Sequence, residues 1–291
     1  MERDNYLVET SWLAEHLHDQ QLRIVDMRGY VKTVLNDGVQ DALYIGARDE
    51  YEQGHIPNAV YIDWSSDIVD PDDAIEAQIA PPERFKQAME QIGIGDQHLV
   101  VAYDAHPASQ FATRLWWALR YYGHERVVVL NGGMTKWLRD GYMLDNTTPS
   151  YPFATFTPSV QSGLRATAHD VLASINQAHK LIIDARESGQ YSGTIVRGHG
   201  RPGHIPGAIN IPREELIDPD DGTFRDSAAL QNVFSAAGVT PQQHVIAYCN
   251  GGVAATTILF SLALLGYPQL TNYDGSWNEW GKRADLPTEV S

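Results

Sequence analysis

An internal duplication constrains the fold of this 291-residue chain more than any other feature of its sequence. Segments of the first half recur in the second half in the same order and at nearly constant spacing, and each copy contains an "HIP" motif. The matching pairs are 22–30 with 181–191, 50–62 with 201–211, 99–124 with 244–268, and 127–137 with 270–280. A repeat of this length indicates two copies of one domain.

The repeat also sets the domain boundaries. We expect an N-terminal domain over 1–145, a linker over 146–164 that is rich in Pro, Thr and Ser, and a C-terminal domain over 165–291. Within each copy, short β-branched runs such as "LVVAYD" alternate with helical patterns such as "FATRLWWALRYYGH". This alternation predicts an α/β fold in which each domain is a mostly parallel sheet flanked by helices on both faces. In such a sheet, ligands bind beyond the carboxyl ends of the strands.

The charge balance excludes several classes of partner. The net charge is −16 and no block of Lys and Arg offsets it, so we expect neither nucleic acid nor an anionic membrane surface as a partner. No apolar run approaches the roughly 18 residues of a membrane span, and the first residues lack the apolar core of a signal peptide. A single cysteine excludes an internal disulfide, so we expect a cytoplasmic protein.

That cysteine, Cys249, lies at the end of one predicted strand. "HVIAYC" is typical of a strand, "NGG" of a turn and "VAATTILFSLALLG" of a helix. A thiol at a helix N-terminus faces the positive end of the macrodipole, which favours the thiolate and makes a nucleophile. The alternative interpretation is a small buried hydrophobe, a common role of a free cysteine. In the first copy, the same junction holds Asp104, so only the second copy can perform thiol chemistry.

Several motifs together resemble the sulfurtransferases built from two tandem rhodanese domains. They are "HIPNA" and "HIPGA", "IIDARESGQYSG", "YDGSWNEW" and a cysteine that opens a six-residue loop, and the resemblance runs from about Trp12 to about Asp285. The resemblance implies a non-catalytic N-terminal domain, with Asp104 at the cysteine position, and a catalytic C-terminal domain that carries Cys249.

The family resemblance also implies a mechanism. The cysteine thiolate takes the outer sulfur of an anionic donor, thiosulfate or 3-mercaptopyruvate, and passes it from a persulfide to a thiophilic acceptor such as cyanide, a thiol or a thioredoxin-like protein. No cofactor or metal is expected. The loop amides should stabilise negative charge on the sulfur, and the loop residues concerned are Asn250, Gly251, Gly252, Val253, Ala254 and Ala255.

An anionic donor needs local positive charge in so acidic a chain. The resemblance assigns Arg186, in "IIDAR", and Arg197, seven residues before His204, to donor binding, with Arg201 as a weaker candidate. Solvated surface charges are the alternative for each arginine. His199 and His204 do not indicate a metal site, because His204 has a counterpart, His55, in the copy without a cysteine.

The cysteine loop departs from both subfamilies. "CNGGVAA" lacks the loop cations of the vertebrate thiosulfate enzymes and the loop hydroxyl of the mercaptopyruvate enzymes. Asp67 matches an aspartate of the mercaptopyruvate charge relay, but residues 77–82 supply no histidine to complete it. We therefore expect thiosulfate as the donor, because departing sulfite needs no proton donor, and keep 3-mercaptopyruvate as the alternative.

Domains of this fold suggest two alternative functions. Phosphatases of this fold need an arginine six residues after the cysteine, where this chain has Ala255, so the sequence argues against phosphate chemistry. A non-enzymatic persulfide carrier or regulatory module is the alternative from another class, and slow turnover with every small donor would favour it.

Overall fold

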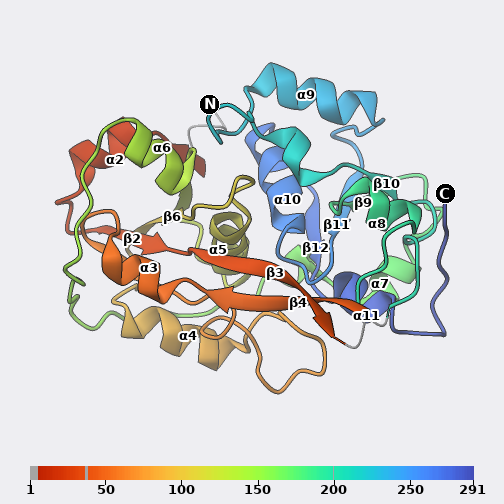
Figure 1. Cartoon of the computed structure of the whole chain (residues 1–291), viewed down its shortest axis with the longest axis horizontal. Helices are drawn as coiled ribbons and strands as arrows, with labels where there is room; N and C mark the ends of the chain where they lie inside the picture. The colour runs from red at the N-terminus through yellow and green to blue at the C-terminus, as the bar shows by residue number, and fades with distance from the viewer. Residues whose placement is uncertain (1–5, 37–38, 199) are drawn as a thin grey trace.

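The computed structural model describes residues 6–36, 39–198 and 200–291, and it contains two similar α/β halves side by side (Figure 1). The N-terminal half contains β1 (Leu7–Val8), α2 (Thr10–His16), β2 (Leu22–Asp26), β3 (Gly29–Asn36), β4 (Val39–Gly46), α3 (Arg48–Gln53), β5 (Ala59–Tyr61), α4 (Pro82–Gln91), β6 (Leu99–Tyr103), α5 (Gln110–Tyr121), β7 (Val127–Leu130) and α6 (Gly133–Arg139). Its five-stranded sheet has the order β1-β7-β6-β2-β5, and every pairing in it is parallel.

The C-terminal half repeats this plan. It contains η1 (Ser162–Leu164), β8 (Arg165–Ala166), α7 (Ala168–Leu172), β9 (Lys180–Asp184), α8 (Ser188–Ser192), β10 (Ile209–Asn210), η2 (Arg213–Leu216), α9 (Ser227–Ala236), β11 (His244–Tyr248), α10 (Ala255–Leu264), β12 (Leu270–Tyr273) and α11 (Ser276–Trp280). The sheet order is β10-β9-β11-β12-β8, again all parallel. The predicted α/β fold with two mostly parallel sheets is confirmed. The central strands β6 and β11 are apolar and buried almost throughout, as strands covered on both faces must be.

The two halves share one apolar core. Helices α5 and α10, which follow β6 and β11, pack against each other, with the rings of Trp116 and Phe260 perpendicular and 5.0 Å apart. Nearer the helix N-termini, the hydroxyls of Thr113 and Thr256 lie 2.9 Å apart. This packing brings the loop after β6 close to the loop after β11, so the two corresponding junctions meet between the halves.

An antiparallel hairpin, β3–β4, departs from the parallel pattern and was not anticipated from the sequence. It runs from the N-terminal half toward α11 of the C-terminal half (Figure 1). Two residues of the C-terminal half bind the hairpin there. Asn278 donates a hydrogen bond to the Tyr44 hydroxyl (3.1 Å), and the Gly198 amide donates one to the Gln40 carbonyl (2.5 Å). The hairpin therefore covers the junction between the halves. Among the described residues, every helix is too short or too polar to cross a membrane.

Candidate active site

The cysteine junction is held rigidly by its backbone. Cys249 directly follows β11 and is 4% exposed. Its N–H donates to the Ser276 hydroxyl (3.1 Å) and its carbonyl accepts from the Trp277 amide (3.0 Å). Gly252 has φ +72°, and a Cβ there would lie 2.7 Å from the Asp274 carbonyl oxygen, so this turn requires glycine.

The loop presents a row of unused donors. Within the described chain, the backbone N–H groups of residues 250–255 have no hydrogen-bond acceptor, although 251–255 are buried. Buried N–H groups are almost always paired in folded proteins, so six consecutive unpaired donors beside a cysteine indicate a place for an anion. The N-terminus of α10 adds its positive dipole end at the same point.

The corresponding junction in the N-terminal half is already filled. Asp104 directly follows β6, and its carboxylate accepts the backbone N–H groups of His106 (2.9 Å), Phe111 (2.8 Å) and Ala112 (2.9 Å). Burial raises the pKa of Asp104 to about 7, although these three hydrogen bonds oppose the rise. One copy thus satisfies its loop and helix N-terminus with its own side chain, while the other leaves them open beside a thiol.

A cavity of about 120 Å³ lies over Cys249, and both halves line it. The C-terminal half contributes Arg197, Arg213, Cys249, Asn250, Gly251, Val253 and Ala254. The N-terminal half contributes Val31, Tyr44, Trp64, His106 and Gln110. Of the residues predicted from the sequence, the structure therefore brings Arg197 and most of the loop to the cavity, while Gly252 shapes the turn and Ala255 begins α10.

Two arginines give the cavity its positive charge. The Arg197 guanidinium donates to the Thr33 hydroxyl of the hairpin (3.2 Å). Arg213, which the sequence analysis missed, pairs with Glu214 (2.9 Å), while its buried Nε has no partner among the described residues. The side-chain amide of Asn250 donates to the side-chain carbonyl of Gln190 (3.0 Å). The loop side chain is thus tethered, and the backbone and the two arginines remain for an anion.

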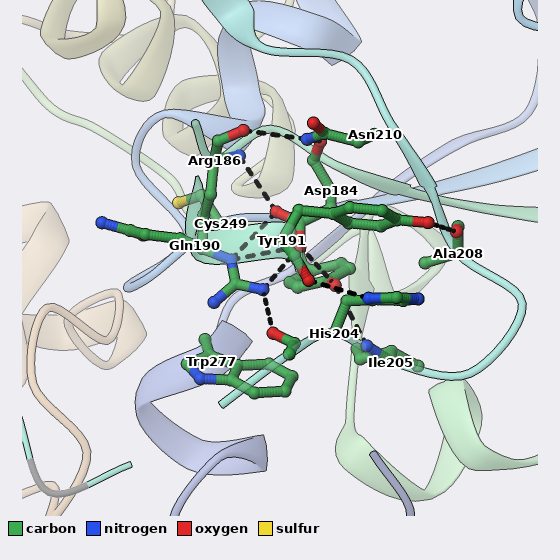
Figure 2. A network of polar contacts seen from close by, with 12 residues as sticks. Asp184, Arg186, Gln190, Tyr191, His204, Ile205, Ala208, Asn210, Cys249 and Trp277 are labelled. Carbon is green, nitrogen blue, oxygen red and sulfur yellow. Dashed lines mark hydrogen bonds and ion pairs between the residues drawn. The ribbon is translucent and has the colours of Figure 1, made fainter. Parts of the chain in front are cut away.

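Arg186, the leading arginine of the sequence analysis, lies elsewhere. Its guanidinium pairs with Asp184 (2.6 Å), donates to the Gly203 carbonyl (2.8 Å) and does not line the cavity. Figure 2 shows it between the Asp184 carboxylate and the ring of Trp277, 4.3 Å from the ring centre. These contacts use Nε and Nη2, while Nη1 makes no hydrogen bond among the described residues. Because the side chain lies outside the cavity lining, donor binding by Arg186 stays a prediction.

The corresponding arginine of the N-terminal half explains why Arg186 pairs with Asp184. Arg28 pairs with Asp26 (2.7 Å) and donates to the Gly54 carbonyl (2.7 Å), which is the same arrangement in the half without a cysteine. An arginine that recurs in both halves serves the fold common to both. Arg186 and Asp184 therefore form a buried structural ion pair that fixes the turn after β9.

The histidines of the "HIP" motifs are structural in the same way. The His204 ring donates to the Tyr191 carbonyl (2.8 Å) and stacks on the Tyr191 ring at 3.8 Å. His55 makes the same pair of contacts to Tyr51, at 2.8 and 4.0 Å. The duplicated geometry explains both as turn residues. His199 lies outside the described residues.

Two weaker candidates also lie away from the cavity. Arg201 donates to the carbonyls of Trp280 (3.1 Å) and Arg283 (2.7 Å) and so caps the end of α11. Asp67 accepts the backbone N–H of Asp63 (2.8 Å) and lines a different hollow of the N-terminal half. Neither side chain is positioned to touch a molecule beside Cys249.

Comparison with known proteins agrees with this architecture. The rhodanese-like domain family matches residues 9–140 and 167–283. The chain is 34% identical to the 3-mercaptopyruvate sulfurtransferase of Escherichia coli over 98% of both chains, and 32% identical to the thiosulfate sulfurtransferase of Rattus norvegicus over 98% of this chain and 95% of the relative. The crystal structure of SseA, a 3-mercaptopyruvate sulfurtransferase from Escherichia coli, superposes with a TM-score of 0.81 at 31% identity, over 94% of this chain and 98% of that one. The chain thus belongs to the rhodanese-like domain family, as a tandem protein whose relatives include sulfurtransferases.

Proposed function

We propose that the protein transfers a sulfane sulfur from a small anionic donor to a thiophilic acceptor through a persulfide on Cys249. The observation that carries the proposal is the row of unpaired N–H groups of residues 250–255 beside a buried thiol. A terminal persulfide sulfur carries a full negative charge at neutral pH. Six backbone donors and a helix N-terminus would stabilise that charge.

The first half-reaction is a displacement at sulfur. The Cys249 thiolate attacks the outer sulfur of thiosulfate, a new S–S bond forms, and the old S–S bond breaks. The bond pair leaves with sulfite, so charge balances without a proton transfer. In the second half-reaction, cyanide or a thiolate attacks the terminal sulfur and Cys249 departs as thiolate.

The charges in the cavity support an anionic donor. Arg197 and Arg213 line the same space as Cys249 in a chain with a net charge of −16. Arginine binds sulfonate-like and carboxylate oxygens through its planar donor fork. Between the two donors we propose thiosulfate, because the loop residues 250–254 contain no hydroxyl that would protonate a departing enolate.

The alternative donor is 3-mercaptopyruvate. The relative from Escherichia coli bears that name and is 34% identical over almost the whole chain. Both donors would place an anionic group against Arg197 and Arg213. The two proposed reactions therefore use one site and differ in the leaving group. Relative kcat/KM values for the two donors distinguish them directly.

The test is thiocyanate formation from cyanide with each donor, for the native chain and for Cys249→Ser. We expect turnover by the native chain, none by the serine variant, and a mass increase of one sulfur atom on Cys249 after donor treatment without cyanide. Arg197→Ala should raise the KM for the donor while it leaves the thiocyanate yield from preloaded persulfide unchanged. If the native chain turns over neither donor, or if Cys249→Ser is as active as the native chain, this proposal is wrong.

A further inference from the structure

The loop after β6, residues 104–110, forms part of the wall of the Cys249 cavity although it belongs to the half without a cysteine. Asp104 uses its carboxylate to hold the loop and the first turn of α5 closed. The N-terminal half therefore has no anion site of its own at this junction. Two polar side chains of this segment, His106 and Gln110, instead line the cavity over Cys249.

Gln110 has an unused amide. The residue is 3% exposed and lines the cavity, yet its side-chain amide has no hydrogen-bond partner among the described residues. The atoms of this amide are not fully enclosed by protein, so the group is free to hydrogen-bond a molecule in the cavity. Since the amide borders the space above Cys249, a molecule bound there would provide the missing partner.

His106 presents a donor to the same space. Its Nδ1 accepts the backbone N–H of Ala108 (3.0 Å), so the neutral ring carries its proton on Nε2. Burial lowers the pKa of His106 to about 3, and the charge of nearby Arg213 contributes. The ring consequently remains neutral at working pH and can donate a hydrogen bond without repelling Arg213.

The position of this wall relative to Cys249 is fixed by direct contacts. The Thr257 hydroxyl, in the first turn of α10, donates to the Ala108 carbonyl (3.1 Å). The Thr113 hydroxyl, in α5, lies 2.9 Å from that of Thr256. These bonds join the loop 104–110 to the helix that begins just after the cysteine loop. The two loops therefore act as opposite walls of one rigid site.

We propose that His106 and Gln110 bind the leaving group of the donor, so that the non-catalytic half determines which donors are used. The inference rests on the proposed sulfur transfer. As the S–S bond of thiosulfate breaks, the electron pair moves onto sulfite and negative charge grows on its oxygens. The Nε2–H of His106 and the amide N–H of Gln110, beside Arg213, supply donors to those oxygens.

The two half-reactions separate this role from a structural one. The variants His106→Phe and Gln110→Leu preserve side-chain size. In each variant, we expect the attack of Cys249 on thiosulfate to release sulfite about ten- to a hundredfold more slowly than in the native protein. This is the effect of losing a hydrogen bond to a charged group. Thiocyanate formation from preloaded persulfide should be unchanged, because the leaving group has already departed. Sulfite should also inhibit the variants less strongly than the native protein.

Gln269→Leu, an exposed position away from the cavity, is the matched control and should leave both half-reactions at the native rate. Urea unfolding of each variant identifies any that fails to fold. If both variants release sulfite within about twofold of the native rate, the inference is wrong while the proposed function stands. If the native protein itself forms no persulfide, the proposed function fails first.

Discussion

Arg114→Met tests whether the N-terminal half also positions the cysteine loop. Arg114 lies on α5 in the N-terminal half, and its side chain is 2% exposed. One guanidinium nitrogen lies 2.6 Å from the Asp274 carboxylate and 3.2 Å from the Gly252 carbonyl, and the other donates to the Ala77 carbonyl (2.9 Å). Methionine fills similar space but removes all three contacts. The buried Asp274 carboxylate and the Gly252 carbonyl of the cysteine loop therefore each lose a partner.

The expected loss of stability follows from what remains around Asp274. Breaking a buried ion pair by removing one partner costs about 3–5 kcal/mol. Here the second carboxylate oxygen keeps the Ile79 amide (2.9 Å) and the more exposed Arg165 at 3.4 Å. Because these contacts still neutralise part of the charge, we expect the lower end, about 3 kcal/mol.

The expected loss of activity follows from the loop. The Gly252 carbonyl keeps only the Asn272 amide (3.0 Å) when Arg114 is removed. A small displacement of the loop would misdirect its N–H groups, and misplacements of about 1 Å can cost about a hundredfold in rate. We expect kcat to fall by about ten- to a hundredfold, with a smaller change in donor KM because Arg197 and Arg213 remain.

Urea unfolding and steady-state kinetics measure both effects, and Arg120→Met is the matched control. Arg120 lies on the same helix but makes only ring contacts, to Tyr6 (5.0 Å) and Trp116 (4.9 Å), among the described residues. Its loss should cost less than about 1 kcal/mol. Equal stability and equal kcat for the two variants would refute the reasoning, since only Arg114 bonds the cysteine loop.

Two further predictions concern the duplicated positions. Arg186→Ala should lower the free energy of unfolding by about 3–5 kcal/mol in urea titrations, and Arg28→Ala should lower it equally, because each change leaves a buried aspartate without its ion-pair partner. If the donor KM rises for folded Arg186→Ala but not for Arg28→Ala, Arg186 binds the donor. The pKa of Asp104 is raised to about 7 in the folded chain. Between about pH 4 and 7, the folded chain therefore holds a proton that the unfolded chain has lost. The free energy of unfolding consequently falls as pH rises through this window, by at most about 4 kcal/mol. Asp104→Asn should flatten the decline in urea midpoint between about pH 4 and 7, and an unchanged pH profile would contradict the assignment.

Much of the fold was predictable because its signals are local or repeated. The duplicated segments predicted two α/β units, and the runs around β6 and β11 predicted buried parallel strands within a residue of their observed ends. The hairpin was missed, although "LNDGV" (35–39) between two alternating runs is a hairpin signal. The repeat gives no signal for this hairpin, because the parallel plan of the two halves does not include an antiparallel pair.

The site was predicted in part, and the position of Arg186 is informative. An arginine after a strand-ending aspartate has the same sequence pattern whether it binds that aspartate or a ligand. The repeat contained the distinguishing signal, since "DMR" at 26–28 matches "DAR" at 184–186 in the copy without a cysteine. His106 and Gln110 could not be found in this way, because only the packing of α5 on α10 brings them near Cys249.

The duplication itself explains why one site needs two domains. In both copies a strand end meets a helix N-terminus, and the exposed N–H groups there require an anion or an acceptor. Asp104 supplies the acceptor permanently in one copy, which makes that copy rigid and chemically closed. Cys249 is too short and too weak an acceptor to do the same, so the N–H groups of its loop stay without an acceptor among the described residues. The closed copy can then serve as a fixed wall, and the open copy as the reacting loop, of a single cavity between them.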